Sequence, residues 1–494
     1  MKLSKDLFQP KKIKENLLTN KTTKQTIIKN TFWLSASLFL SKVIKYFLVI
    51  YAARILGAAE YGTFNFAMSF AALFYIFADL GIGSLISREI AQNREKKINI
   101  SAGFTLKLVL TFLTFFGIVL ISFFVPSAEN IKITIWLMAI FTLVNGLTNY
   151  LYNCFYGREE MQYQTITEVI EAGIATVLGI YLISLVPKAY ILSINYVVSA
   201  VVGFLVMLPI FGKKFGQFVK LDFDKKEWKR ILSLAWPISL SWACFNILTY
   251  TDVTFMGFFK LFEQVGYYSA SQKVIALLIL PANIIITSVF PTLSKNSKEN
   301  QNHAQRIFNF QNFLLLGIIL PLIFGGYFLA QEVIFFLYGA EYSPSVLVLK
   351  ILIFLTFLTY FSSVLANLLF VYNEQKRTFW AYLVGGIINV ILNAFFIPKW
   401  GMAGAAYATI ISSGVSFLGL IYLSLKYTPL KLFNFSFFKS FILLTLASIG
   451  MMAFLMEFFV GFSLIIKVIV GAIIYFLLAS LIWYLGKKFG FLNI

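Results

Sequence analysis

Two lysines lie deep inside a long apolar stretch near the start of this 494-residue sequence, where a basic side chain could bind an anion. The stretch 31–56 is long enough to cross a bilayer, for which about 20 apolar residues suffice. Lys42 and Lys45 lie near its midpoint, where a cation costs roughly 2.5–3.5 kcal/mol. They are three residues apart and share one helical face, which Ser37 and Ser41 extend. We expect this face to line a water-filled cavity that receives an anion.

Other polar residues within apolar stretches would complete such a cavity. Lys273, next to Gln272, faces the first stretch if the two halves of the chain are pseudo-symmetric, and otherwise extends to the nearer outer surface. Lys107 lies about one turn into its stretch, so that cavity and surface are equally suitable. Asn246 belongs to a polar stripe suited to sugar hydroxyls or to helix–helix contacts. The predicted substrate-binding set is Lys42, Lys45, Lys107, Lys273, Ser41, Asn246 and Gln272.

Four acidic residues also fall within apolar stretches, namely Asp79, Glu168, Glu171 and Asp252. Glu168 and Glu171 share a helical face near one end of their stretch, and Asp79 lies toward the same side. An acid at membrane depth either binds a coupling ion, here H⁺ or Na⁺, or neutralises a nearby base. The basic residues that these acids could neutralise are Arg88 and Lys107. Both interpretations stay open at this point.

Composition excludes a soluble protein. Hydrophobic residues make up 59% of the chain and charged residues 13%, and the mean hydropathy is +0.82; soluble domains carry nearer 25% charged residues. The two cysteines, Cys154 and Cys244, lie in apolar runs, and the one histidine, His303, lies in a polar loop. These residues cannot form a metal-ligand cluster. We therefore expect no metal, no cofactor and no catalytic residues.

Fourteen apolar segments follow a lysine-rich start, and the basic residues between them indicate how they are threaded. With the N-terminus inside, 30 of the 41 lysines and arginines fall on the cytoplasmic side and five on the other. Basic residues favour the cytoplasmic side. We expect a multi-pass protein of the cell membrane with both termini in the cytoplasm. This placement accounts for the net positive charge of the chain, so binding to nucleic acid is not needed to explain it.

The predicted organisation is two six-helix lobes in parallel orientation around a central cavity, followed by two further helices. Short motifs recur at an offset near 200–210 residues, as in a repeat protein: Gly57–Gly62 and Gly257–Gly266 each follow the first span of a half. The expected parts are a basic tail 1–30, a lobe 31–211, a linker 212–230, a second lobe 231–424 and the end 425–494. The linker contains Asp222-Phe223-Asp224, a pattern of metal-dependent glycosyltransferases; without an α/β domain around it, we interpret it as solvated linker.

Several motifs together resemble the polysaccharide-unit (Wzx-type) flippases, in the superfamily that also holds MATE exporters and lipid II flippases. The motifs, which cover roughly residues 30–425, are ARILGAAEYG (53–62), DLGIG (79–83), REIA (88–91), PISL (237–240) with Asp252, VGYYSA (265–270), FPTLS (290–294), YGAEY (338–342) and NVILNAFFIPKWGMAGAAYAT (389–409). One departure is Val253, where many relatives carry arginine, which puts a local ion pair with Asp252 in doubt.

The resemblance implies an alternating-access flippase that moves polyprenyl-diphosphate-linked oligosaccharides from the inner to the outer leaflet. It also implies a basic cavity for the diphosphate and sugar, and a groove near the last two helices for the lipid tail. The expected partners are that glycolipid, membrane lipid, and glycosyltransferases or a polymerase of the same pathway, with the chain itself a monomer.

Two other functions compete. A MATE-like ion-coupled exporter of organic cations would need acidic cavity walls, whereas the mid-depth charges here are basic. A membrane-embedded glycosyltransferase, polymerase or ligase would need a sizeable extramembrane loop, and these loops are short. No G-x-x-x-x-G-K-[ST] motif occurs, so energy would come from an ion gradient, the membrane potential or removal of product.

Overall fold

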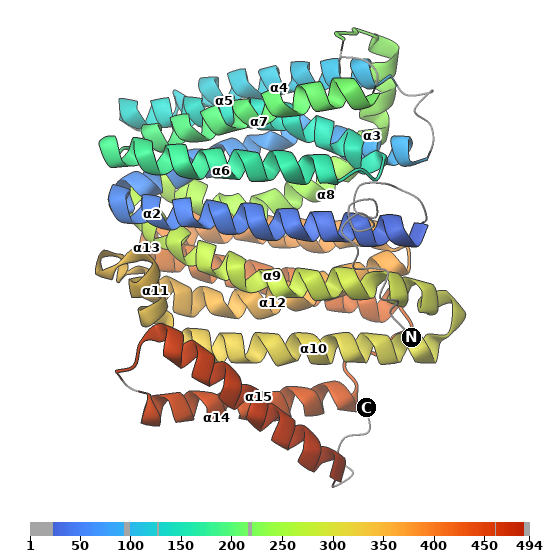
Figure 1. Ribbon diagram of the computed structural model, residues 1–494, viewed down its shortest axis with the longest axis vertical. Coiled ribbons are helices and arrows are strands. Elements are labelled where there is room, and N and C mark those ends of the chain that lie inside the picture. The colour runs from blue at the N-terminus through green and yellow to red at the C-terminus, as the bar shows by residue number, and fades with distance from the viewer. Residues whose placement is uncertain (1–22, 93–98, 126–127, 216–219, 460, 489–494) are drawn as a thin grey trace, which may run out of the picture. The chain divides into compact units, whose positions relative to one another are not determined.

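The computed structural model of the chain is helical throughout the part that it describes, residues 23–92, 99–125, 128–215, 220–459 and 461–488 (Figure 1). These residues form α-helices and one 3₁₀ turn, without a strand among them. Helices satisfy their backbone hydrogen bonds internally, as a chain in hydrocarbon must. The all-α membrane fold predicted from the sequence is confirmed.

The helices pack into two compact units, residues 1–243 and 244–494. Unit 1 contains α2 (Thr23–Asp79), α3 (Ile82–Ala91), α4 (Ile100–Ser122), α5 (Glu129–Gly157), α6 (Gln162–Leu185), α7 (Ala189–Phe215) and the first part of α8 (Lys225–Phe258). Within it, α2 packs along α6, and α5 packs along α7. The predicted lobe boundary lies in the linker 212–230, whereas the two units meet inside α8.

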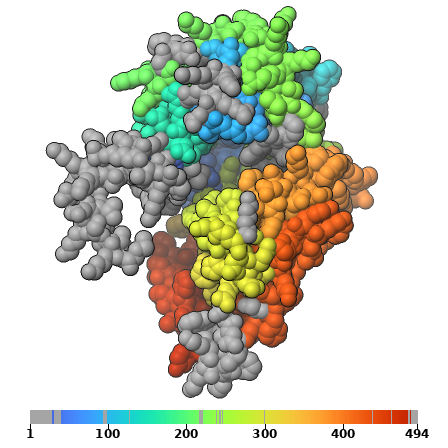
Figure 2. Space-filling view, turned by 90° about the vertical axis from the view of Figure 1, so that its right-hand side faces the viewer, coloured from blue at the N-terminus to red at the C-terminus, as the bar shows by residue number. Residues whose placement is uncertain are grey.

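Unit 2 contains the end of α8 and the remaining elements, α9 (Phe262–Glu299), α10 (Gln301–Phe328), α11 (Ala330–Tyr338), η2 (Ala340–Tyr342), α12 (Ser345–Val371), α13 (Gln375–Tyr427), α14 (Phe435–Phe458) and α15 (Leu464–Lys488). Helix α12 packs against α9 and α13, and α10 packs against α9 and α14. Figure 2 shows the end of this unit where α9 and α10, in yellow, lie beside α13 and α14, in orange to red.

The fourteen predicted apolar segments all fall on helices, although some of them share one. In the described ranges, ten helices are long and apolar enough to cross a membrane, and the pair formed by α2 and α3, bent by 47°, makes eleven. Helix α13 holds two predicted segments and breaks at Gly401 (φ 55°), and α2 breaks in the same way at Gly57 (φ 70°). Glycine adopts positive φ without a steric penalty, so each break folds one helix back into a hairpin.

The segment before α8 is anchored to unit 1 by its own side chains. Asp224 accepts hydrogen bonds from the amides of Lys226 (2.9 Å) and Glu227 (3.2 Å), which caps the first turn of α8. Asp222 accepts one from Asn99 Nδ2 (2.5 Å). The two aspartates of the D-x-D pattern thus have local structural roles, as an N-cap and as a contact to the start of α4.

Candidate functional site

Lys42 and Lys45 on α2 differ in their surroundings. Lys45 Nζ lies 3.0 Å from Glu171 Oε1 on α6. Lys42 is exposed, and among the described residues no carboxylate lies within 4.0 Å of its ammonium group. The exposed apolar side chains Leu40 and Phe47 lie on another side of α2, since successive residues turn by about 100°. Both ammonium groups therefore leave the helix away from its most apolar exposed side.

The register between α2 and α6 brings Lys45 to Glu171. Thr165 Oγ1 donates to the carbonyl of Trp33 (2.9 Å), and Thr176 Oγ1 donates to that of Ile44 (3.1 Å). In each case the partners are 132 residues apart in sequence, so the two helices run parallel in one register. Each hydroxyl donates its hydrogen bond to the backbone of the neighbouring helix, which holds α2 against α6.

Lys107 lies inside unit 1 rather than at its edge. Its side chain is fully buried, its Nζ lies 2.5 Å from Asp79 Oδ1, and it also lies over the Tyr75 ring at 5.2 Å from the centroid. Asp79 thus neutralises Lys107, which is one of the two interpretations that the sequence left open for this acid.

The two acids of α6 have partners other than those predicted. Glu171 binds Lys45 instead of Arg88 or Lys107. Glu168 accepts a hydrogen bond from Gln164 Nε2 (2.7 Å), one turn away. Ser41, predicted to extend the face of the lysines, is buried on α2.

A fully buried carboxylate, Asp252, forms a second polar centre in unit 2. It accepts hydrogen bonds from Tyr268 Oη (2.6 Å), Asn393 Nδ2 (2.7 Å), Asn389 Nδ2 (3.2 Å) and the Thr409 hydroxyl. In the described part of the chain, no basic side chain comes within ion-pair distance of it. The four side chains that donate to it are neutral, and its neighbour in sequence, Val253, is apolar.

The partners of Asp252 are the residues that sequence reasoning missed. Asn389 and Asn393 stand four residues apart in an apolar segment, so they share a helical face, and this spacing was the available signal. Both are fully buried on α13, as expected for polar residues that serve a partner inside the unit. Asn393 Oδ1 is buried, and none of the described residues donates a hydrogen bond to it.

The other predicted cavity residues lie in unit 2 and are not fully buried. Asn246 on α8 and both Gln272 and Lys273 on α9 are half-buried. That Lys273 faces the first span stays a prediction, because it concerns both units.

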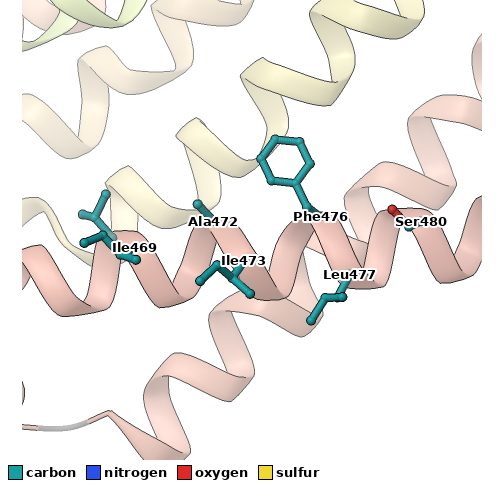
Figure 3. Close-up of a pocket in the computed structure, with 7 residues that line it drawn as sticks. Ile469, Ala472, Ile473, Phe476, Leu477 and Ser480 are labelled. Atoms are coloured by element: carbon teal, nitrogen blue, oxygen red, sulfur yellow. The ribbon is translucent and has the colours of Figure 1, made fainter.

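An apolar depression lies on α15, with a volume of about 600 Å³ (Figure 3). Its labelled lining residues are Ile469, Ala472, Ile473, Phe476, Leu477 and Ser480. Nearby, Lys467 at the start of α15 is buried and pairs with Glu332 on α11 at 2.6 Å, which ties α15 to the rest of unit 2. A surface of this composition suits hydrocarbon.

Comparison with known sequences gives the family. The profile of the family described as "Polysaccharide biosynthesis protein" matches residues 27–297, more than half of the chain, including Lys42, Lys45 and Asp252. The chain belongs to this family. It is 23% identical over 420 residues to an uncharacterized membrane protein of Methanocaldococcus jannaschii, MJ1068, covering 78% of this chain and 82% of that one. It is 21% identical to the capsular polysaccharide biosynthesis protein CapF of Staphylococcus aureus, covering 80% and 98%.

A shorter match is to the probable low-salt glycan biosynthesis flippase Agl15 of Haloferax volcanii, with 25% identity over 34% of this chain and 36% of the relative. Among solved structures, the lipid II flippase MurJ in an inward closed conformation superposes with a TM-score of 0.70 at 19% identity, covering 91% of this chain and 98% of MurJ. An inward-facing MATE multidrug transporter of the MOP superfamily superposes with a TM-score of 0.63 at 16% identity, covering 79% and 97%. This family member therefore has the fold of MOP-superfamily transporters.

Proposed function

We propose that this family member is a flippase that moves polyprenyl-diphosphate-linked oligosaccharide units from the inner to the outer leaflet by alternating access, for cell-surface polysaccharide assembly. The observation that carries the proposal is the pair Lys42 and Lys45, which lie before the break of α2 at Gly57 and are turned away from the most apolar exposed side of the helix. A phosphate oxygen 4 Å from such an ammonium gains about 4 kcal/mol at an effective dielectric of 20, which offsets the cost of placing the lysine there. Agl15 and MurJ, named as flippases, support the same assignment.

The proposal is tested by reconstitution. We expect proteoliposomes that contain the full chain to transfer a fluorescent polyprenyl-diphosphate disaccharide between leaflets, measured as its accessibility to an added quencher, at least tenfold faster than protein-free liposomes. The same vesicles should not accumulate an organic cation such as ethidium. Ethidium transport without glycolipid transfer would replace the flippase by the exporter.

We also propose that Asp252 couples transport to an ion. A buried carboxylate without a basic partner is costly when charged, so it is expected to hold a proton or a cation during part of the cycle. Its neighbours fit a small hard cation: the Thr409 hydroxyl and the unpaired Asn393 Oδ1 are oxygen ligands, and such ligands suit hard cations. Na⁺ and H⁺ are the two candidates that this chemistry allows.

Asp252→Asn separates coupling from binding, because asparagine keeps the shape but cannot be deprotonated. In proteoliposomes with an imposed Na⁺ or H⁺ gradient, we expect the gradient to accelerate glycolipid transfer by the wild type and to leave the rate of Asp252→Asn unchanged. The stimulation by the gradient should fall at least tenfold in this variant. Glu168→Gln, which removes an acid paired with an amide, should keep the wild-type response. Full stimulation of Asp252→Asn would refute coupling at this residue.

A further inference from the structure

Lys45 already forms an ion pair with a carboxylate of the protein itself. Its ammonium lies 3.0 Å from Glu171 Oε1, and its side chain is 37% exposed where that of Glu171 is 14% exposed. A ligand can therefore reach the lysine, while the carboxylate lies behind it. Lys42, three residues earlier, is exposed and has no carboxylate within ion-pair distance in the described ranges. This face of α2 thus presents Lys42, whose ammonium group has no carboxylate within ion-pair distance in the described ranges, and Lys45, whose ammonium group is paired with Glu171.

The carboxylate of Glu171 is positioned by several helices. A Cβ atom at Gly203 on α7 would lie 3.1 Å from Glu171 Oε2, so the glycine leaves room for the carboxylate. Tyr152 on α5 and Tyr196 on α7 lie near enough to interact electrostatically with it. In the part of the chain that the structure describes, Lys45 on α2 is its ion-pair partner, and Glu168, one turn earlier on α6, also acts on Tyr152. Four packed helices therefore hold Glu171 where it meets the lysine.

We propose that Glu171 sets the charge that a ligand must carry in order to bind at Lys45. The inference rests on the proposed function and adds selection among anions. A singly charged ligand only replaces one carboxylate at Lys45 by an equivalent anion and leaves Glu171 without its counter-ion, so it gains little. A diphosphate carries more charge than a carboxylate and can contact both lysines, so it displaces Glu171.

The consequence is discrimination by competition. Headgroups with one negative charge are abundant in membranes, and a pair of open lysines would bind them as well. Pairing with Glu171 weakens the binding of singly charged headgroups at Lys45, because specificity arises as much from penalising the wrong ligand as from attracting the right one. Lipids linked through a diphosphate are then selected from a large excess of singly charged lipids.

Anion titration of the purified full-length chain tests this inference. By isothermal titration at pH 7.5 and constant ionic strength, we expect the wild type to bind inorganic pyrophosphate at least tenfold more tightly than dimethyl phosphate, which carries a single negative charge. Glu171→Gln, which keeps the side-chain size beside Gly203, should bind dimethyl phosphate about tenfold more tightly than the wild type, so the ratio falls. Glu168→Gln is the matched control: it removes the acid one turn away and should keep the wild-type ratio.

An unchanged or larger ratio of the two affinities in Glu171→Gln overturns the inference. An equal fall of this ratio in Glu168→Gln overturns it too, because the effect would then come from the net charge of the protein and not from Glu171. These outcomes leave the proposed function intact as long as pyrophosphate binding needs the lysines. Wild-type pyrophosphate binding in the variant Lys42→Ala/Lys45→Ala would instead remove the diphosphate site itself, and with it both proposals.

Discussion

Translocation of the polyprenyl-diphosphate glycolipid is expected to fall at least tenfold when Lys42 and Lys45 are both replaced with alanine. Each ammonium contributes an attraction of up to about 4 kcal/mol to a phosphate oxygen at 4 Å when the effective dielectric is 20. Even a third of this energy corresponds to about tenfold, since 1.4 kcal/mol is a factor of ten. The measurement is the rate at which everted vesicles with the variant transfer the labelled glycolipid.

The single variants divide the effect between the two lysines. Removing Lys45 alone leaves Glu171, which is 14% exposed, without its counter-ion, so Lys45→Ala is compared with Lys45→Ala/Glu171→Gln. Lys42→Arg/Lys45→Arg keeps both charges and should retain most of the rate. Lys350→Ala, at a lysine that packs over the Tyr327 ring in unit 2, controls for loss of charge elsewhere. Wild-type transfer by the double alanine variant would refute the assignment of the anion site to α2.

The largest expected effect on stability is that of Asp79→Ala. Lys107 is fully buried and Asp79 is its ion-pair partner at 2.5 Å, so the substitution leaves a buried ammonium beside the Tyr75 ring, without a counter-ion among the described residues. Breaking a buried pair by removing one partner costs about 3–5 kcal/mol. For a unit of this size, about 2–4 °C per kcal/mol applies, so thermal unfolding in detergent should begin about 10 °C lower.

Removing the stranded charge should restore most of that stability. Asp79→Ala/Lys107→Met replaces the pair by apolar groups, of which methionine is close to lysine in size, and we expect it to unfold within a few degrees of the wild type, because apolar replacements of buried pairs are often neutral or stabilising. Glu374→Ala provides the exposed comparison: its partner Arg377 lies at 2.6 Å but is 41% exposed, and such pairs contribute about 0.2–1 kcal/mol. Equal unfolding temperatures for Asp79→Ala and the wild type would show that Lys107 finds another counter-ion.

The helical spans could be predicted from the sequence because the bilayer imposes a local rule. A run such as 345–371 must satisfy its own backbone in hydrocarbon and must be about 20 residues long, so hydropathy alone locates it, and α12 occupies Ser345–Val371. Lys42 and Lys45 stood out for the same reason, since a charge inside such a run is costly. The sharing of one helix by two spans was less predictable: it depends on single glycines, Gly57 and Gly401, whose positive φ folds the chain back within one turn.

By itself, then, the sequence determined the helical membrane fold and the intramembrane charges, because both follow from the energetics of each segment in hydrocarbon. Only the tertiary structure decided which charges meet. Glu171 reaches Lys45 across 126 residues, and the four donors of Asp252 come from two other helices, as far as 157 residues along the chain. Such pairings depend on the register between packed helices, to which the interhelical hydrogen bonds of Thr165 and Thr176 contribute, and no single segment carries that information.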